Sequence, residues 1–179
     1  FFWEEDYPED FLSGTALDIA FINFEDWLVC DYKHTDTFID AFLSWKKEKG
    51  EEVDGETQKM LDAMKSSYIS LYEVASAGDG LALKDLLFNE AIKVGDGIGG
   101  LDAGDVFAAR VLKVNGSNIL GRCAYPFKQD MKAAIRGYVD KQFSRYKKHK
   151  RSEGSFKEFL KEEAYLFNII WVNSLMKAN

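Results

Sequence analysis

The sequence predicts an α+β protein with N-terminal helices, a five-stranded antiparallel sheet closed into a small barrel-like form, and two C-terminal helices. Apolar residues recur at helical spacing over residues 14–68, form short or alternating runs over residues 69–127, and return to helical spacing after Pro126. The chain has 179 residues and is 46% apolar, so it can bury a core. We expect regions 1–68, 69–127 and 128–179 to form one compact unit.

The N-terminal region predicts three helices, over residues 14–33, 35–50 and 54–68. Gly50 is the expected end of the second helix, and Asp54 is the expected N-cap of the third. The side chains expected to face inward are Leu17, Ala20, Phe21, Phe24 and Leu28 in the first helix, Phe38, Phe42 and Trp45 in the second, and Met60, Leu61, Met64 and Tyr68 in the third.

The middle region predicts short strands joined by turns that are rich in Gly, Asn and Asp. Asn115-Gly116 indicates a hairpin, because both central positions of a type I′ turn need positive φ. Five antiparallel strands leave two exposed edges unless the sheet closes, so we expect closure into a small barrel. The expected strands are Ile69–Ala75, Leu81–Leu87, Glu90–Val94, Asp105–Val114 and Asn118–Tyr125.

The C-terminal region predicts one helix after Pro126 and a second that begins at Ser155. Glu158 lies three residues after Ser155, the spacing of a capping box, and Thr15 and Asp18 predict the same device for the first helix of the chain. The apolar face of the helix after Pro126 is formed by Met131, Ile135, Tyr138, Gln142 and Tyr146.

The second half of the last helix, residues 165–176, is apolar nearly all round. Such a helix is either buried in the core or covered by something else. Two occupants stay open, a partner protein or a missing segment of the parent chain, because the sequence opens at Phe1 rather than Met. The candidate interface residues are Tyr165, Ile169, Val172 and Met176.

Charge is distributed unevenly along the chain, whose net charge is −7. Residues 1–63 hold 17 acidic and 5 basic residues, whereas residues 128–151 hold 9 basic and 2 acidic residues. Clustered cations beside a small barrel could bind nucleic acid or an acidic partner, but we prefer a solvated helix surface or one that pairs with the acidic N-terminal helices of the chain itself. The candidate contact residues are Lys132, Arg136, Lys141, Arg145, Lys147, Lys148, Lys150 and Arg151.

Gly95, Gly97 and Gly100 have the G-x-G-x-x-G spacing of a dinucleotide-binding turn. That motif needs a following helix, whose N-terminus holds the pyrophosphate. The residues that follow here, through Val106 and Val111, favour a strand instead. We therefore predict a turn between two strands and no bound cofactor.

The remaining reactive residues do not form a recognisable catalytic or metal site. Asp96, Asp102 and Asp105 are close together but lack the spacing of a calcium loop. Cys30 and His34 would share a face only on a continued helix, so we expect a buried structural cysteine. His149 has no neighbour with ligand spacing. We predict no catalytic residue and no metal ligand.

Two cysteines, without a C-x-x-C pair, favour a reducing compartment. The sequence contains no apolar run of the ~20 residues that a membrane-spanning helix needs. We therefore expect a cytoplasmic protein that does not cross a membrane.

Several segments keep the order of a known pattern: FEDWLVCDY, SYISLYEV, GLALKDLLFNEAIKV and LDAGDVFAARVL, followed by NILGRCAYPF. Over about residues 21–127 the chain resembles the region that precedes the metal-binding SEC-C motif in poorly characterised bacterial proteins. Ala103 stands where that pattern has Pro, and Phe88-Asn89 stands where it has Thr-Gly. The Cys-rich SEC-C tail is absent, so the resemblance transfers no zinc ligand.

The resemblance implies a helix-flanked small barrel and brings no known reaction with it. With the apolar last helix and the uneven charge, it leads us to predict a non-catalytic intracellular module that binds a protein partner. Nucleic-acid binding through residues 128–151 and an enzyme of unknown class stay as alternatives.

Overall fold

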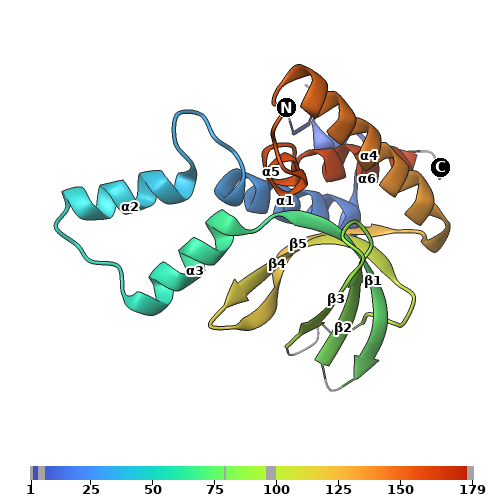
Figure 1. Cartoon of the computed structure of the whole chain (residues 1–179), viewed down its shortest axis with the longest axis horizontal. Coiled ribbons are helices and arrows are strands. Elements are labelled where there is room, and N and C mark those ends of the chain that lie inside the picture. The colour runs from blue at the N-terminus through green and yellow to red at the C-terminus, as the bar shows by residue number, and fades with distance from the viewer. Residues whose placement is uncertain (1, 4–6, 79, 96–99, 177–179) are drawn as a thin grey trace.

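The structure is a computed structural model that describes residues 2–3, 7–78, 80–95 and 100–176. Within these ranges the chain forms six α-helices, two short 3-10 helices and five strands (Figure 1). The α-helices are α1 (Gly14–Cys30), α2 (Phe38–Glu48), α3 (Gly55–Ser66), α4 (Lys132–His149), α5 (Phe156–Glu162) and α6 (Leu166–Met176). The strands are β1 (Ile69–Gly78), β2 (Gly80–Asp85), β3 (Glu90–Val94), β4 (Val106–Val114) and β5 (Ser117–Phe127). The 3-10 helices cover Pro8–Asp10 and Gln129–Met131.

The five strands form one antiparallel sheet in the order β3-β2-β1-β4-β5. The predicted hairpin joins β4 to β5, and its central residues Asn115 and Gly116 have φ of 51° and 81°. Positive φ at both positions is what a type I′ turn requires. The predicted mixed helix and strand architecture is therefore confirmed.

The predicted closure into a barrel is wrong, because β3 and β5 remain the two edges of the sheet. The curled sheet does bring their ends together: Gly95 N donates to Asn118 O at 3.1 Å, and Asn118 Nδ2 donates to Lys93 O at 3.0 Å. β3 has only 5 residues and β5 has 11, so the short edge strand meets just one end of the long one.

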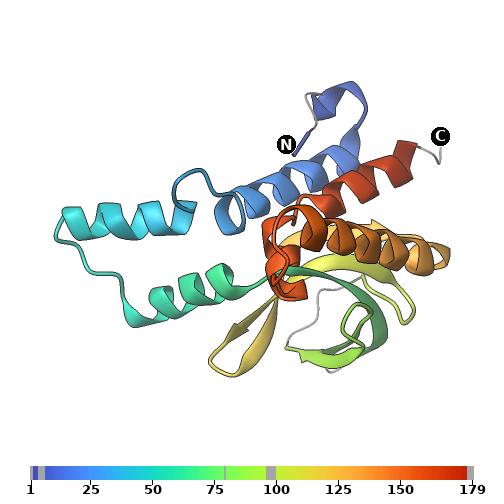
Figure 2. The same ribbon diagram turned by 45° about the horizontal axis from the view of Figure 1, so that its top comes forward.

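The main core lies between the sheet and the helices α1, α4, α5 and α6, which gather on one side of it (Figures 1 and 2). The rings of Trp171 of α6 and Tyr125 of β5 pack in a T-shaped arrangement, and both side chains are buried. A second core fills the inside of the curl, where the buried residues are Tyr72, Val74, Leu81, Leu83, Val94, Phe107 and Ala109.

Helices α2 and α3 extend away from this body as an arm (Figure 2). The prediction that Phe38, Phe42 and Trp45 face inward is wrong, since their exposed fractions are 51%, 38% and 49%. Ile39 is the buried residue of α2. The aromatic residues do lie on a helix, as their spacing predicts, but the arm has too few neighbours to cover that face.

The capping predictions had mixed outcomes. Asp54 caps α3 by accepting from the backbone N of Glu56 and Thr57, and Ser155 and Glu158 form the predicted capping box of α5. The box predicted at Thr15 is wrong, because the N-cap of α1 is Ser13 and makes no side-chain capping bond.

The last predicted helix is two helices, so the C-terminal region has three α-helices rather than two. α5 ends at Glu162, and Glu163 has a non-helical φ of −111° and ψ of 28°. The break lets Phe159 of α5 and Phe167 of α6 both reach the core, where their exposed fractions are 1% and 0%.

Candidate functional site

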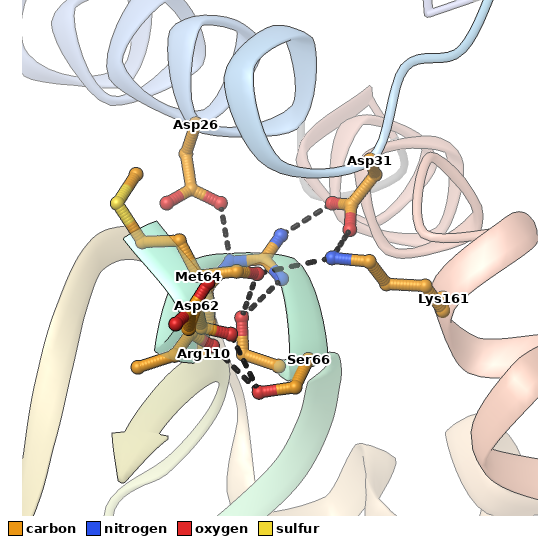
Figure 3. Close-up of polar contacts among 9 residues, drawn as sticks. Asp26, Asp31, Asp62, Met64, Ser66, Arg110 and Lys161 are labelled. Atoms are coloured by element: carbon orange, nitrogen blue, oxygen red, sulfur yellow. Dashed lines mark hydrogen bonds and ion pairs between the residues drawn. The ribbon is translucent and has the colours of Figure 1, made fainter. Parts of the chain in front are cut away.

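A buried cluster of charged side chains surrounds Arg110 of β4, which is 1% exposed (Figure 3). Arg110 Nε donates to Asp26 Oδ2 at 2.9 Å, and Nη1 donates to Ser67 Oγ at 3.1 Å. Nη2 donates to Asp31 at the end of α1. Lys161 of α5 completes the cluster, with Nζ 3.0 Å from Asp31 Oδ1 and 3.2 Å from Met64 O.

The charges within this cluster balance, since Arg110 and Lys161 face two aspartates. Burial raises the pKa of Asp31, and the adjacent Arg110 and Lys161 oppose that rise. Burial also lowers the pKa of Lys161, which Asp31 opposes. A buried, paired and hydrogen-bonded set of this kind holds segments together rather than binding a substrate.

The cluster connects all three sequence regions. Asp26 and Asp31 come from residues 1–68, Arg110 from residues 69–127 and Lys161 from residues 128–179. We did not predict this cluster from the sequence. A single Arg in the apolar run VFAARVL is nevertheless a signal, because a charge at such a position needs buried partners. Gly121 lets β5 approach the backbone of β4 closely at Arg110, because a Cβ at position 121 would lie 3.1 Å from Arg110 O.

A second buried carboxylate, Asp85, shapes the turn between β2 and β3. Its Oδ1 accepts from Ser70 Oγ at 2.9 Å, Leu87 N at 2.9 Å and Phe88 N at 3.1 Å. Asn89 in the same turn has a φ of 56°. The two backbone bonds hold the turn and the bond from Ser70 ties it to β1, so these contacts are structural.

Cys30 and His34 do not form a pair. α1 ends at Cys30, which is 1% exposed, while His34 is exposed beyond the helix end. Burial raises the pKa of the Cys30 thiol to about 11, which keeps it protonated at neutral pH. The expected burial of Cys30 is confirmed.

The glycine-rich segment joins two strands, as predicted. β3 ends at Val94 and β4 begins at Val106, with no helix in the part of this connection that the structure describes. Asp102 N donates to Asp105 Oδ2 at 2.8 Å within a turn. Gly97 and Asp96 lie outside the described residues.

The described ranges contain neither a metal-binding group nor a membrane span. No group of three or more His, Cys, Asp and Glu side chains there could hold a metal ion. None of the helices described is long and apolar enough to span a bilayer.

A surface groove runs between α4 and α6. One hollow of about 380 Å³ is lined by Met131, Ala134, Ile135 and Tyr138 on α4 and its N-terminal flank and by Ile169, Ile170, Asn173 and Ser174 on α6. A second, of about 330 Å³, continues toward α5 and shares Tyr138 and Ile169 with the first. Tyr138 is 38% exposed, although it was predicted to face inward.

The four predicted interface residues all border hollows around α6. Tyr165 and Ile169 line the 330 Å³ hollow, while Ile169, Val172 and Met176 line a smaller one of about 100 Å³ beside the N-terminal segment. Met176 is 58% exposed and the other three are half-buried. No Asp, Glu, Lys or Arg occurs in α6, so this helix contributes no charged side chain to these hollows.

Three of the eight predicted basic contact residues are paired within the chain. Lys132 lies 2.7 Å from Glu73, Lys150 pairs with Glu163, and Arg151 lies 2.9 Å from Glu162. The other five are exposed and have no carboxylate partner in the described ranges; they are Arg136, Lys141, Arg145, Lys147 and Lys148.

At ~100° per residue, these five cations fall on two sides of α4. Lys141, Arg145 and Lys148 lie within about 60° of one another, beside the groove that Tyr138 lines. Arg136 and Lys147 lie on the opposite side, so the structure divides the predicted basic surface in two.

The comparisons with known proteins identify a family but no activity. A family described as "Family of unknown function (DUF7986)" matches residues 20–163. No curated protein and no solved structure matches the chain. Because the matched segment is more than half of the 179 residues, the chain belongs to this family of unknown function.

Proposed function

We propose that this chain is a non-catalytic intracellular module that binds a partner protein along the groove between α4 and α6. The observation that carries the proposal is the uncharged α6, whose half-buried Ile169 borders three hollows. An exposed apolar surface of this kind marks an interaction site more often than it marks ordinary solvent-facing surface.

The shape of the surface fits a helical occupant. Two helices with an apolar floor between them form the groove that receives an amphipathic helix in many complexes. Tyr138 and Ile169 stand where the two larger hollows meet, so they would contact the centre of the bound segment. Central, partly enclosed aromatic and aliphatic residues commonly dominate binding energy.

Capture followed by reconstitution tests this proposal. The purified chain is used as bait in a lysate of its host, the bound protein is identified by mass spectrometry, and the purified pair is titrated calorimetrically. Ile169→Asp should weaken binding at least tenfold, because it places a carboxylate on the apolar floor. Ile119→Asp, at a 41% exposed position on β5, is the matched control and should bind like the wild type.

Equal affinity for the two variants and the wild type would contradict the proposal. Tyr138→Ser provides a second floor variant, since Tyr138 is exposed enough to be replaced without unfolding the chain. If the captured protein is a further segment of the parent chain, the same variants apply and the groove is an intramolecular interface.

Nucleic-acid binding through α4 has less support as the function. Three of the eight predicted basic residues are paired with carboxylates, and the remaining five lie on two sides of α4. A nucleic-acid footprint needs Lys and Arg gathered on one face.

We also propose kinship with the region that precedes SEC-C motifs. The segment GLALKDLLFNE folds as β2, a turn and the start of β3, and Asp85 accepts two backbone hydrogen bonds that hold the turn. A structure of one SEC-C-type protein tests this: its matching Asp should accept the same backbone bonds. An Asp exposed in a different turn would count against the kinship.

A further inference from the structure

The charged residues around the groove are predominantly basic. Arg145 and His149 line the 330 Å³ hollow, and Lys141 and Lys148 flank Arg145 on α4. Glu163 also lines this hollow, but Lys150 pairs with it. The charge of Arg145 and its two neighbours is therefore not cancelled within the described ranges, in a chain whose net charge is −7.

We infer that the partner segment is an acidic amphipathic helix. Its apolar side chains would rest on Tyr138 and Ile169, and its carboxylates would face Lys141, Arg145 and Lys148. This inference rests on the proposed function and adds the chemistry of the partner. Opposite charges along one edge of a groove fix the direction and register of the bound helix and speed its association.

The charges also disfavour a second copy in a two-fold arrangement. A symmetric dimer across this groove would bring Lys141, Arg145 and Lys148 of both copies together. Like charges in such a contact are costly. An acidic partner removes that cost, because each cation then faces a carboxylate.

The dimensions of the groove set the length of the partner. α4 has 18 residues, so the wall it forms is about 27 Å long. A helix of roughly 15–18 residues spans that length at ~1.5 Å per residue. Its apolar residues should recur at i, i+4 and i+7, since only one stripe of the helix meets the floor.

A display selection tests the inference even while the natural partner is unidentified. The probe is a library of 18-residue helical peptides with random surface positions, selected on the full chain and counter-selected on Ile169→Asp. We expect enriched peptides with an apolar stripe at helical spacing and a clear excess of Asp and Glu. The three most enriched peptides are then measured by fluorescence anisotropy at low and at physiological salt.

Two Arg variants on α4 isolate the role of charge. Arg145→Glu should weaken the enriched peptides at least fivefold, and added salt should reduce this difference. Arg136→Glu makes the same change on the opposite side of α4 and should leave affinity within twofold. Circular dichroism and thermal unfolding confirm that both variants fold.

The outcomes separate the inference from the proposed function. Enriched peptides that are neutral or basic, yet depend on Ile169, would overturn the acidic partner and leave groove docking intact. Failure to enrich any peptide that depends on Ile169 would overturn both. Concentration-dependent dimerisation lost in Ile169→Asp, or DNA binding lost in Arg145→Glu, would replace the acidic helix with another occupant and overturn the inference.

Discussion

Arg110 illustrates how one residue can organise this fold. It lies on β4 and is 1% exposed. It contacts Asp26 within α1, Asp31 at the end of α1 and Ser67 at the end of α3. A buried guanidinium keeps its charge, so its carboxylates must stay in place. Such pairs add little net stability when intact, but removing one member leaves a buried charge without a counter-ion.

Arg110→Met should therefore lower the free energy of unfolding by about 3–5 kcal/mol. The substituted side chain fills similar volume but leaves Asp26 and Asp31 with Lys161 as the remaining cation. Arg122→Met on β5 is the control, because Arg122 is exposed and should change stability by less than about 0.5 kcal/mol. Urea unfolding measures the free energy of unfolding of both variants. Equal and small losses of stability would show that the fold does not require the cluster.

The Cys30 thiol makes a separate prediction about pH. Burial raises its pKa to about 11, whereas an unfolded cysteine has a pKa of about 8.5. The unfolded chain therefore loses the proton first, so Cys30 makes stability fall as pH rises from about 8.5 to about 11.

Cys30→Ala should remove that part of the pH dependence. Urea unfolding at several pH values compares the two proteins, and the free energy of the variant should fall less steeply in this window. Buried tyrosine side chains titrate in both proteins, so the difference between the two pH profiles isolates the contribution of Cys30. Parallel profiles would mean that the thiol is accessible in the folded state.

In the arm formed by α2 and α3, apolar residues at helical spacing are not buried. The stripe of Phe38, Phe42 and Trp45 has the spacing of a core-facing helix, yet its side chains are between 38% and 51% exposed. Spacing specifies which side chains share a face of a helix. It does not specify whether another element reaches that face.

Substitutions on α2 should reflect the observed burial rather than the pattern. Trp45→Ser should change the free energy of unfolding by no more than about 1 kcal/mol, since it loses only surface contacts with Lys46 and Phe42. Ile39→Ala, at a position 2% exposed, should cost about 2–5 kcal/mol. The reverse order, measured by urea unfolding, would place the aromatic stripe in a core.

The break between α5 and α6 shows a similar limit. The capping box at Ser155 was predictable because its residues are local. The end of α5 was not predictable, because it depends on where Phe159 and Phe167 meet the distant sheet. Local chemistry therefore predicted where this helix begins, and tertiary packing decided where it ends.

For the whole molecule, the sequence predicted the order of helices and strands and the hairpin at Asn115-Gly116. It did not predict how far the sheet curls, because closure depends on the lengths of its two edge strands. The cluster around Arg110 joins residues as far apart in the chain as Asp31 and Lys161, and no local pattern encodes such a contact. Only the wall of the groove that contains Ile169 was predicted from the sequence, as a candidate protein interface.

The groove between α4 and α6 is the proposed docking surface, and the exposed face of α2 is its competitor. The most direct measurement is a backbone amide NMR titration of the labelled chain with the captured partner or the most enriched helical peptide. The account predicts that the amide shifts change most around Tyr138, Arg145 and Ile169. Changes confined to the residues around Phe38, Phe42 and Trp45 would contradict it.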